Sequence, residues 1–298
     1  MIVAKPVGGL ANQLVIYSAA YKLSLLKVDR VYLDLSHFDG NLKRKFRLEE
    51  LNFEHNICHP LTILLKFKRF AFSSNKVFRF IGEKLNKNGI YGDNCFKENS
   101  LEFDESFLYI SGDVYLEGDF ISYKYYSDIL RDLREKFKPK QLSNSALELI
   151  EIVKNKNFAS IHYRRGDYMT DAVAKSFHGL LDIEYYKNAI TELEKLTPVL
   201  TYYVFTDDVE VARQDFNFLS NVEFVGEIDG LTDIDELEIM KNIKNNIIAN
   251  SGFSRWGALL NYNESPNVIM PRSWFRGYDI ATTEIGPDNW VRIDSVFI

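Results

Sequence analysis

The chain has 298 residues, of which 46% are hydrophobic and 26% charged, a composition that supports folded domains and argues against disorder. Its net charge of −6 excludes the broad positive field that attracts nucleic acid. Its two cysteines, Cys58 and Cys95, have no metal-ligand spacing, and no stretch is typical of a signal peptide or a membrane span, so we expect a cytoplasmic protein.

The predicted elements begin with a βαβ unit. The apolar run 2–7 predicts a buried strand that ends at a Gly-Gly pair. Residues 10–25 carry apolar side chains at intervals of three and four, which predicts a helix, and 31–35 predict a second strand. Residues 36–110 show few clear periods. The next predicted elements are a strand at 115–118 and a helix at 125–137.

Pro139 and the polar stretch 141–145 indicate a domain boundary. Beyond it, strands and helices alternate, which is typical of a doubly wound α/β sheet. The predicted strands are 158–162, 200–205, 222–225, 247–249 and 268–270, and the predicted helices are 146–154, 184–196, 233–243 and 253–260. We therefore expect two Rossmann-like domains, 1–140 and 141–298, with a C-terminal tail that can pack back on the first.

The strongest candidate site follows the strand 158–162 directly. It contains His162, Arg164, Arg165 and Asp167. Arginine suits phosphate because its planar fork donates two parallel hydrogen bonds to it. Ligands of open α/β sheets bind beyond the carboxyl ends of the strands, which is where this pair stands. The alternative is a surface loop closed by an Arg–Asp ion pair.

Three further segments also stand at predicted strand ends. The turn 8–13 offers backbone N–H groups to an anion, although it matches neither common phosphate-loop pattern, and it can equally be a tight strand–helix turn. Asp207 and Asp208 can bind ribose hydroxyls or a base N–H, or cap the following helix. The segment 250–256 offers serine hydroxyls and N–H groups to phosphate, or holds a plain serine cap.

An Asp-x-Asp pattern at Asp233 and Asp235 matches that of metal-dependent sugar transfer. It opens a predicted helix, however, and acidic side chains are expected in a first helical turn because they interact favourably with the helix dipole. We therefore predict no metal site.

Together these segments resemble the α-1,2-fucosyltransferase family. The HxRRxD motif of that family is matched in full by His162, Arg164, Arg165 and Asp167. Its glycine-rich start is similar to 8–13, its Phe-Ser/Thr-Asp-Asp element is matched by 205–208, and its Asn-Ser-Ser-Phe-Ser-Trp-Trp helix start is matched in part by 250–256. Ala11, Val15, Ile16, Gly252 and Arg255 depart from the usual family residues.

The resemblance implies a GT-B-like α/β fold, with two doubly wound domains facing a central cleft. It implies an inverting transfer of L-fucose from GDP-β-L-fucose to the 2-hydroxyl of an acceptor sugar, a galactoside, in surface polysaccharide synthesis, with no metal. The alternatives are a related GDP-deoxysugar such as colitose, and a nucleotide-sugar-binding protein without activity.

Residue roles also follow from the resemblance. Arg164 stabilises the leaving GDP, Arg165 organises the loop, and Asp167 either acts as general base or pairs with Arg165. His162 is the fourth member of this catalytic group. The expected donor contacts come from Gly9, Asn12, Gln13, Arg164, Asp207, Asp208, Ser251, Phe253 and Ser254.

The segment 61–81 mixes large apolar residues with five cations and no acid. Such a segment can hold the enzyme at the inner membrane face, where a lipid-linked glycan acceptor would lie. The alternative is a packed helix with a basic edge. Peripheral membrane contact requires several of Phe67, Phe70, Phe78 and Phe80 to be exposed.

Overall fold

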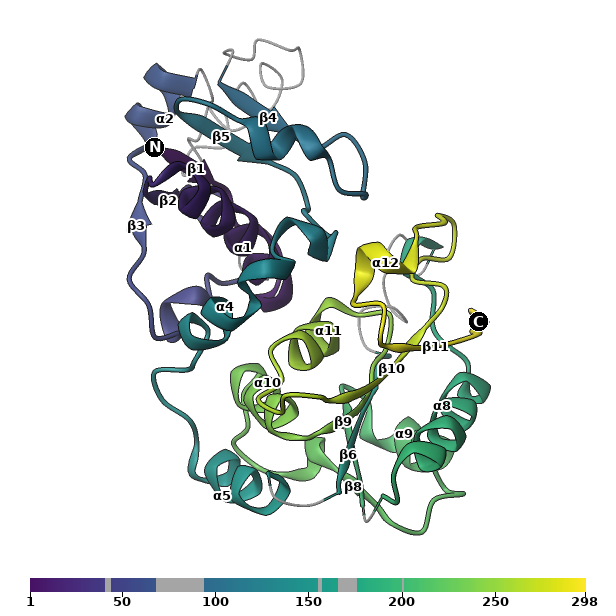
Figure 1. Ribbon diagram of the computed structural model, residues 1–298. Helices are drawn as coiled ribbons and strands as arrows, with labels where there is room; N and C mark the ends of the chain where they lie inside the picture. Colours follow the sequence, from purple (N-terminus) through teal and green to yellow (C-terminus); the bar gives the residue numbers. More distant parts are fainter. Residues whose placement is uncertain (41–43, 68–93, 155–156, 166–175, 200) are drawn as a thin grey trace. The chain divides into compact units, whose positions relative to one another are not determined.

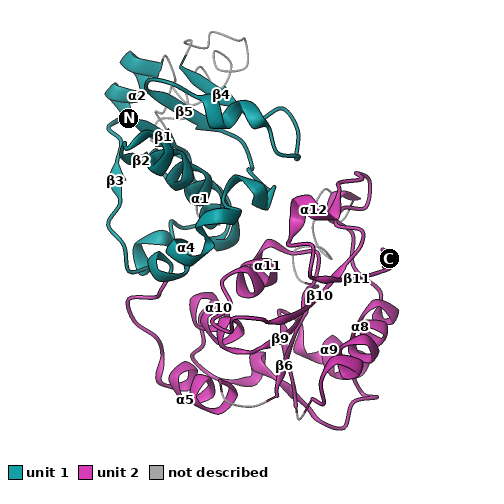
Figure 2. Ribbon diagram, in the orientation of Figure 1, with its two compact units in different colours: residues 1–137 teal, residues 138–298 magenta. Residues whose placement is uncertain are grey.

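The computed structural model describes residues 1–40, 44–67, 94–154, 157–165, 176–199 and 201–298. Within them the chain divides into two compact units, Met1–Phe137 and Lys138–Ile298, shown in separate colours in Figure 2. The boundary between the units falls between Phe137 and Lys138, three residues before the predicted boundary between residues 140 and 141.

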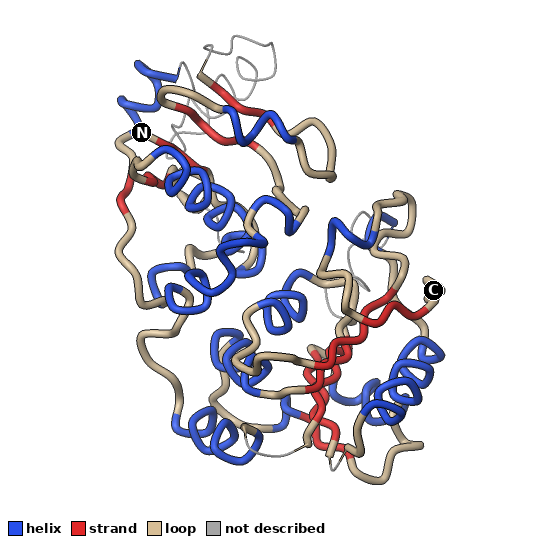
Figure 3. The backbone as a smooth tube through the Cα atoms, viewed as in Figure 1, coloured by secondary structure: helices blue, strands red, loops and turns tan. Residues whose placement is uncertain are grey.

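Unit 1 contains a parallel five-stranded sheet in the order β3-β2-β1-β5-β4 (Figures 1 and 3). Its strands are β1 (Ile2–Ala4), β2 (Val31–Leu33), β3 (Asn56–Ile57), β4 (Cys95–Lys97) and β5 (Val114–Glu117). Its α-helices are α1 (Leu10–Lys27), α2 (Pro60–Phe67) and α4 (Leu130–Lys136), and its 3-10 turns are at 48–50, 105–109, 123–125 and 127–129. The predicted β1–α1–β2 unit is confirmed.

Helix α1 begins after Gly8 and Gly9, as its periodicity predicted. Gly8 has a φ of +68°, and a Cβ at that position would lie 2.8 Å from Asn12 Nδ2, so the turn requires glycine. The helix ends at Val28, which adopts a left-handed conformation and donates its N–H to Ser24.

Helix α2 packs its apolar face into unit 1. Phe67 is buried and its ring lies 6.0 Å from that of Tyr115, and Ile63 is fully buried. Lys66 forms an ion pair with Asp113. Phe67 is therefore not one of the exposed aromatic residues that membrane contact requires, because its ring belongs to the core. Phe70, Phe78 and Phe80 lie outside the described residues.

Unit 2 contains a parallel six-stranded sheet in the order β11-β10-β9-β6-β7-β8. The strands are β6 (Ala159–Tyr163), β7 (Tyr202–Thr206), β8 (Val222–Phe224), β9 (Asn245–Ile247), β10 (Asn267–Pro271) and β11 (Val291–Ile293). The chain runs outward from β6 through β7 and β8, then returns to place β9 on the other side of β6. The strand order therefore reverses between β6 and β9, which is the usual position of a ligand in such sheets.

The helices of unit 2 cover both faces of this sheet (Figure 1). They are α5 (Asn144–Val153), α8 (Ile183–Leu196), α9 (Val209–Asp215), α10 (Asp233–Asn242), α11 (Gly252–Leu259) and α12 (Thr282–Ile285), with a 3-10 turn at 225–227. Each predicted helix and strand of this unit is confirmed to within two residues at its ends, whereas α9, α12 and β11 had no predicted bounds.

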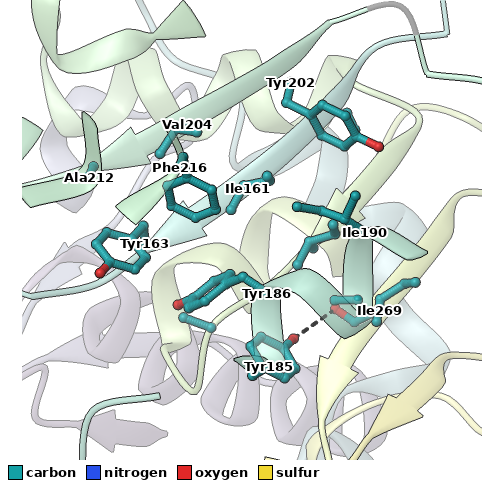
Figure 4. Packing of buried hydrophobic residues seen from close by; sticks show 14 of the residues in the cluster. Ile161, Tyr163, Tyr185, Tyr186, Ile190, Tyr202, Val204, Ala212, Phe216 and Ile269 are labelled. Carbon is teal, nitrogen blue, oxygen red and sulfur yellow. Dashed lines mark hydrogen bonds between the residues drawn. The ribbon is translucent and has the colours of Figure 1, made fainter. Parts of the chain in front are cut away.

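Two hydrophobic clusters hold the sheet between its helices. On one face, Tyr185, Tyr186 and Ile190 of α8 pack against Ile161 and other strand residues (Figure 4). On the other, α5 and α10 pack against Phe158 and its neighbours. Both faces of β6 are thus buried, and its two polar side chains, Ser160 and His162, form hydrogen bonds inside the protein with Asn246 and Ser254. The rigid centre of the sheet positions the residues that follow β6.

Candidate functional site

His162 lies near the carboxyl end of β6, and its buried ring points toward helix α11. Its Nδ1 atom lies 2.9 Å from Oγ of Ser254. Burial first, and then the positive charge of Arg164, lower the pKa of His162 to about 3. The ring is therefore neutral at ordinary pH, and it joins β6 to the first turn of α11.

Arg164 forms an ion pair at the edge of the sheet. Its Nη1 atom lies 2.6 Å from Oδ2 of Asp207, which follows the neighbouring strand β7. Asp207 Oδ1 also accepts a 2.9 Å hydrogen bond from the backbone N–H of Arg165. Both side chains of the ion pair are 29% exposed, so a ligand in solution can reach them. The ion pair therefore holds the Arg164 guanidinium at the edge of the sheet, where the parallel strands β6 and β7 end.

Arg165 points instead into the protein. Its Nη1 atom donates to the carbonyl of Leu181 at 3.0 Å, and its guanidinium lies 3.8 Å from the centre of the Tyr163 ring. Asp215 supplies a carboxylate oxygen at 3.8 Å. These contacts neutralise the buried charge and tie the end of β6 to the segment before α8. Arg165 thus acts on the loop rather than on a ligand in solution.

Helix α11 begins at the switch point. Ser251 is its N-cap and accepts a 3.3 Å hydrogen bond from the N–H of Phe253. Ser254 is 1% exposed, and its hydroxyl is used by His162 and by the carbonyl of Ser251 at 3.5 Å. The hydroxyls of both serines, which were expected to contact the donor, thus form hydrogen bonds within the turn. The positive end of the helix points to the carboxyl edge of the sheet.

The two adjacent aspartates have different partners. Asp208 is the N-cap of α9 and accepts a 3.2 Å hydrogen bond from the N–H of Val211, as the capping alternative predicts. Asp207 pairs with Arg164. The general-base candidate Asp167 lies outside the described residues.

Glu236, on the first turn of α10, is an acid near this site that we did not predict from the sequence. Its pKa is raised to about 7, chiefly by burial and then by the charges of Asp233, Asp207 and Asp235, while Arg164 lowers it. Glu236 therefore interacts electrostatically with both members of the Arg164–Asp207 pair. The sequence showed only an acid in a helical first turn, a pattern that does not indicate which loop it faces.

The Asp-x-Asp pattern is used for capping. Thr232 Oγ1 accepts from the N–H of Asp235 at 3.2 Å, and Asp235 Oδ2 accepts from the N–H of Thr232 at 2.9 Å. Asp235 Oδ1 accepts from Ser143 at 2.9 Å. Among the residues that the structure describes, no three His, Cys, Asp or Glu side chains are grouped to hold a metal ion.

In unit 1, Gln13 is fully buried and holds two loops together. Its Nε2 atom donates to the carbonyls of Gly8 at 3.0 Å and Lys45 at 2.8 Å, and its Oε1 accepts from the N–H of Arg47 at 2.8 Å. Gly9 is the N-cap of α1, and Asn12 is exposed one turn later. Gln13 thus shapes the glycine turn, and Gly9 and Asn12 stand at its surface.

Two all-parallel α/β units with a cationic strand-end site define a GT-B-like glycosyltransferase fold. The match in shape to the crystal structure of POFUT1 in complex with GDP supports this fold, with a TM-score of 0.51, 12% identity, and coverage of 90% of this chain and 96% of that one.

The sequence comparisons show the family. The family model described as Glycosyl transferase family 11 matches residues 15–293. An Alpha-1,2-colitosyltransferase of Escherichia coli is 31% identical over 300 residues, covering 99% of each chain. The O-antigen biosynthesis glycosyltransferase WbnK of Escherichia coli is 31% identical over 305 residues, covering 96% of this chain and 98% of its own. The chain belongs to glycosyl transferase family 11, and the family resemblance predicted from the motifs is confirmed.

Proposed function

We propose that this glycosyltransferase moves a 6-deoxy-L-hexose from a GDP-β-L-sugar to the 2-hydroxyl of an acceptor galactoside with inversion. The observation that carries the proposal is the position of Arg164. In this family 11 chain, Arg164 follows β6 at the switch point of the second sheet, and its side chain is partly exposed. The neighbouring strand β9 leads into α11, whose positive end belongs to the same edge of the sheet.

In the proposed reaction, the acceptor oxygen forms a bond to C1 of the sugar while the bond from C1 to the β-phosphate oxygen breaks. GDP leaves with the bonding electrons, and the hydroxyl proton passes to a carboxylate or to water. Negative charge grows on the β-phosphate. A positioned guanidinium stabilises that charge without moving, because Asp207 already fixes its orientation.

The donor sugar is L-fucose or its 3-deoxy relative colitose. The family resemblance favours fucose, whereas the name of one E. coli relative favours colitose. A panel of GDP-linked sugars, assayed with a galactoside acceptor, distinguishes them by initial rate.

The acceptor we propose is a growing surface polysaccharide on a lipid carrier, as the name of the relative WbnK suggests. No helix in the described parts of the chain is long and apolar enough to cross a membrane. We propose that the enzyme works in the cytoplasm, peripherally at the inner membrane face, without a metal ion.

The alternative is a nucleotide-sugar-binding protein without activity. Both proposals expect GDP to raise the melting temperature more than UDP, ADP or CMP do, since a ligand of the folded state stabilises it by mass action. Only the transferase releases GDP in an acceptor-dependent way. Protection by UDP rather than GDP would overturn both.

A further inference from the structure

Four aromatic side chains form a cluster at the carboxyl edge of the second sheet, and they lie outside the site described so far. The ring of Phe177 lies 5.1 Å from that of His178 and 4.7 Å from that of Phe275. His178 lies 5.6 Å from Phe275, and Tyr278 lies 6.4 Å from Phe275. Phe177 and His178 precede α8, whereas Phe275 and Tyr278 follow β10, so the cluster joins two loops that are far apart in sequence.

Asn250, at the switch point, fixes this arrangement. Its Nδ2 atom donates to the carbonyl of His178 at 2.8 Å and to those of Gly179 and Trp274 at 3.3 Å. The N–H of Arg276 donates to the carbonyl of Phe177 at 2.9 Å. The loops that follow β6, β9 and β10 are thereby tied together on the ligand-binding edge of the sheet.

Two rings of the cluster are open to solvent. Phe177 is 41% and Tyr278 39% exposed, while Phe275 behind them is 4% exposed. The pKa of His178 is lowered by burial and, to a smaller extent, by the charge of Arg164. Phe177 and His178 belong to the same β6–α8 connection as Arg164, so the cluster and the arginine share the carboxyl edge of the second sheet.

We propose that the exposed faces of Phe177 and Tyr278 form the apolar wall that packs against the 6-deoxy sugar of the donor. The inference rests on the proposed function, because it takes Arg164 to bind the phosphates. A 6-deoxyhexose carries a methyl group in place of a hydroxymethyl group. Aromatic faces stabilise such C–H surfaces by burial and dispersion, and they offer no hydrogen bond to a 6-hydroxyl.

The donors that test this wall differ by single oxygens. GDP-β-L-galactose carries the 6-hydroxyl, GDP-β-L-fucose lacks it, and GDP-colitose also lacks the 3-hydroxyl. Calorimetry without acceptor gives the Kd of each donor and of GDP alone. The variants are Phe177→Ala, Tyr278→Ala and the milder Phe177→Leu. The matched control is Phe218→Ala, which removes an equally exposed ring (44%) before β8.

We expect the wild type and the control to bind the fucose donor about 10–100 times more tightly than the galactose donor. Phe177→Ala and Tyr278→Ala should each reduce that ratio by about threefold to tenfold, and Phe177→Leu should reduce it less. The Kd of GDP should change by less than about twofold, since these rings do not contact phosphate.

A ratio that stays unchanged in both alanine variants would overturn the wall, whether or not GDP affinity changes. A wild type that binds neither GDP nor its sugars would overturn the proposed function and the wall together. A wild type that binds GDP, but shows no preference for the fucose donor, would overturn only the wall.

Discussion

Arg164 and Asp207 stand on adjacent strand ends, and their 2.6 Å contact holds a cation at the edge of the second sheet before any substrate arrives. Such preorganisation is effective because the protein does not reorganise when charge develops in the transition state. The same contact implies that Asp207 acts mainly by orienting Arg164.

Arg164→Ala should therefore lower the turnover number by about 10²–10³-fold, because one stabilising charge is lost in the transition state. Arg164→Lys should recover little activity, since an ammonium group lacks the bidentate fork. Initial rates with saturating donor measure both effects. The matched control is Arg213→Ala, which removes an exposed ion pair with Glu227 elsewhere in unit 2. Near-normal turnover in either Arg164 variant would contradict the role.

Ser254→Ala should destabilise the protein by about 1–3 kcal/mol, because the buried Nδ1 of His162 loses the hydroxyl at 2.9 Å. Urea unfolding measures the loss. Ser251→Ala removes only a helix cap and should cost about 1 kcal/mol. An equal or smaller loss in Ser254→Ala would show that the His162 contact contributes nothing.

Much of the fold was predictable because its signals are local. The apolar side chains of α1 recur at the spacing of a helix, and the short segment of β6 ends at the charged pair Arg164 and Arg165, as a strand leading into a loop does. The edge strands β3 and β4 were missed, since two or three residues in an irregular region carry no period. In the site, the cluster at 162–165 was found from its residue types at a strand end. Glu236 was not, because its electrostatic interaction with Arg164 arises only when α10 packs against the sheet.

The polar residues of the motifs show a second limit of sequence. Gln13 and Ser254 are as suitable for binding phosphate as for holding loops, and composition does not distinguish these uses. In the structure, both are buried and bonded within the protein. Only the packing of the whole unit decides which of these side chains is buried and which, like Arg164, reaches solvent.

Glu236 should make stability depend on pH. Its folded pKa of about 7 lies above its ordinary value of 4.5, so the folded state binds more protons than the unfolded state between these values. Stability from this group is therefore complete below pH 4.5 and is lost as the pH rises to about 7. Glu236→Gln should abolish that loss. The free energy of unfolding of this variant should exceed that of the wild type by about 1–3 kcal/mol at pH 8.

The measurement is urea unfolding of wild type and Glu236→Gln at pH 5 and pH 8. Glu98 in unit 1 also has a pKa raised to about 7, mainly by burial, so the wild-type slope contains both groups. The difference between the two proteins isolates Glu236. If the two proteins differ in their free energy of unfolding by the same amount at pH 5 and pH 8, the pKa of Glu236 is not raised.

Activity should survive removal of metal ions. The acid Asp235 is already occupied by Thr232 and Ser143, which leaves the Asp-x-Asp pattern a helix cap. Initial rates after dialysis against EDTA should equal those with added Mg²⁺ or Mn²⁺. Complete loss with EDTA, restored by either ion, would show that a metal takes part.

The last prediction concerns α2 and the membrane. Phe67 and Ile63 face the core, but Leu61 and Leu65 stand one turn apart on the outer face, 51% and 79% exposed. If the segment meets an anionic bilayer, these two side chains are the described residues that enter it, and Lys66 stands beside them. Leu61→Asp/Leu65→Asp should then weaken binding to phosphatidylglycerol vesicles by at least about tenfold in flotation at low salt.

The control is Leu147→Asp, which changes an exposed leucine (49%) on α5 and should leave binding unaltered. A wild type that does not float with these vesicles, or a double variant that floats as well as the wild type, would show that α2 is purely structural. The acceptor would then be brought to the enzyme by its own glycan rather than by a shared membrane surface.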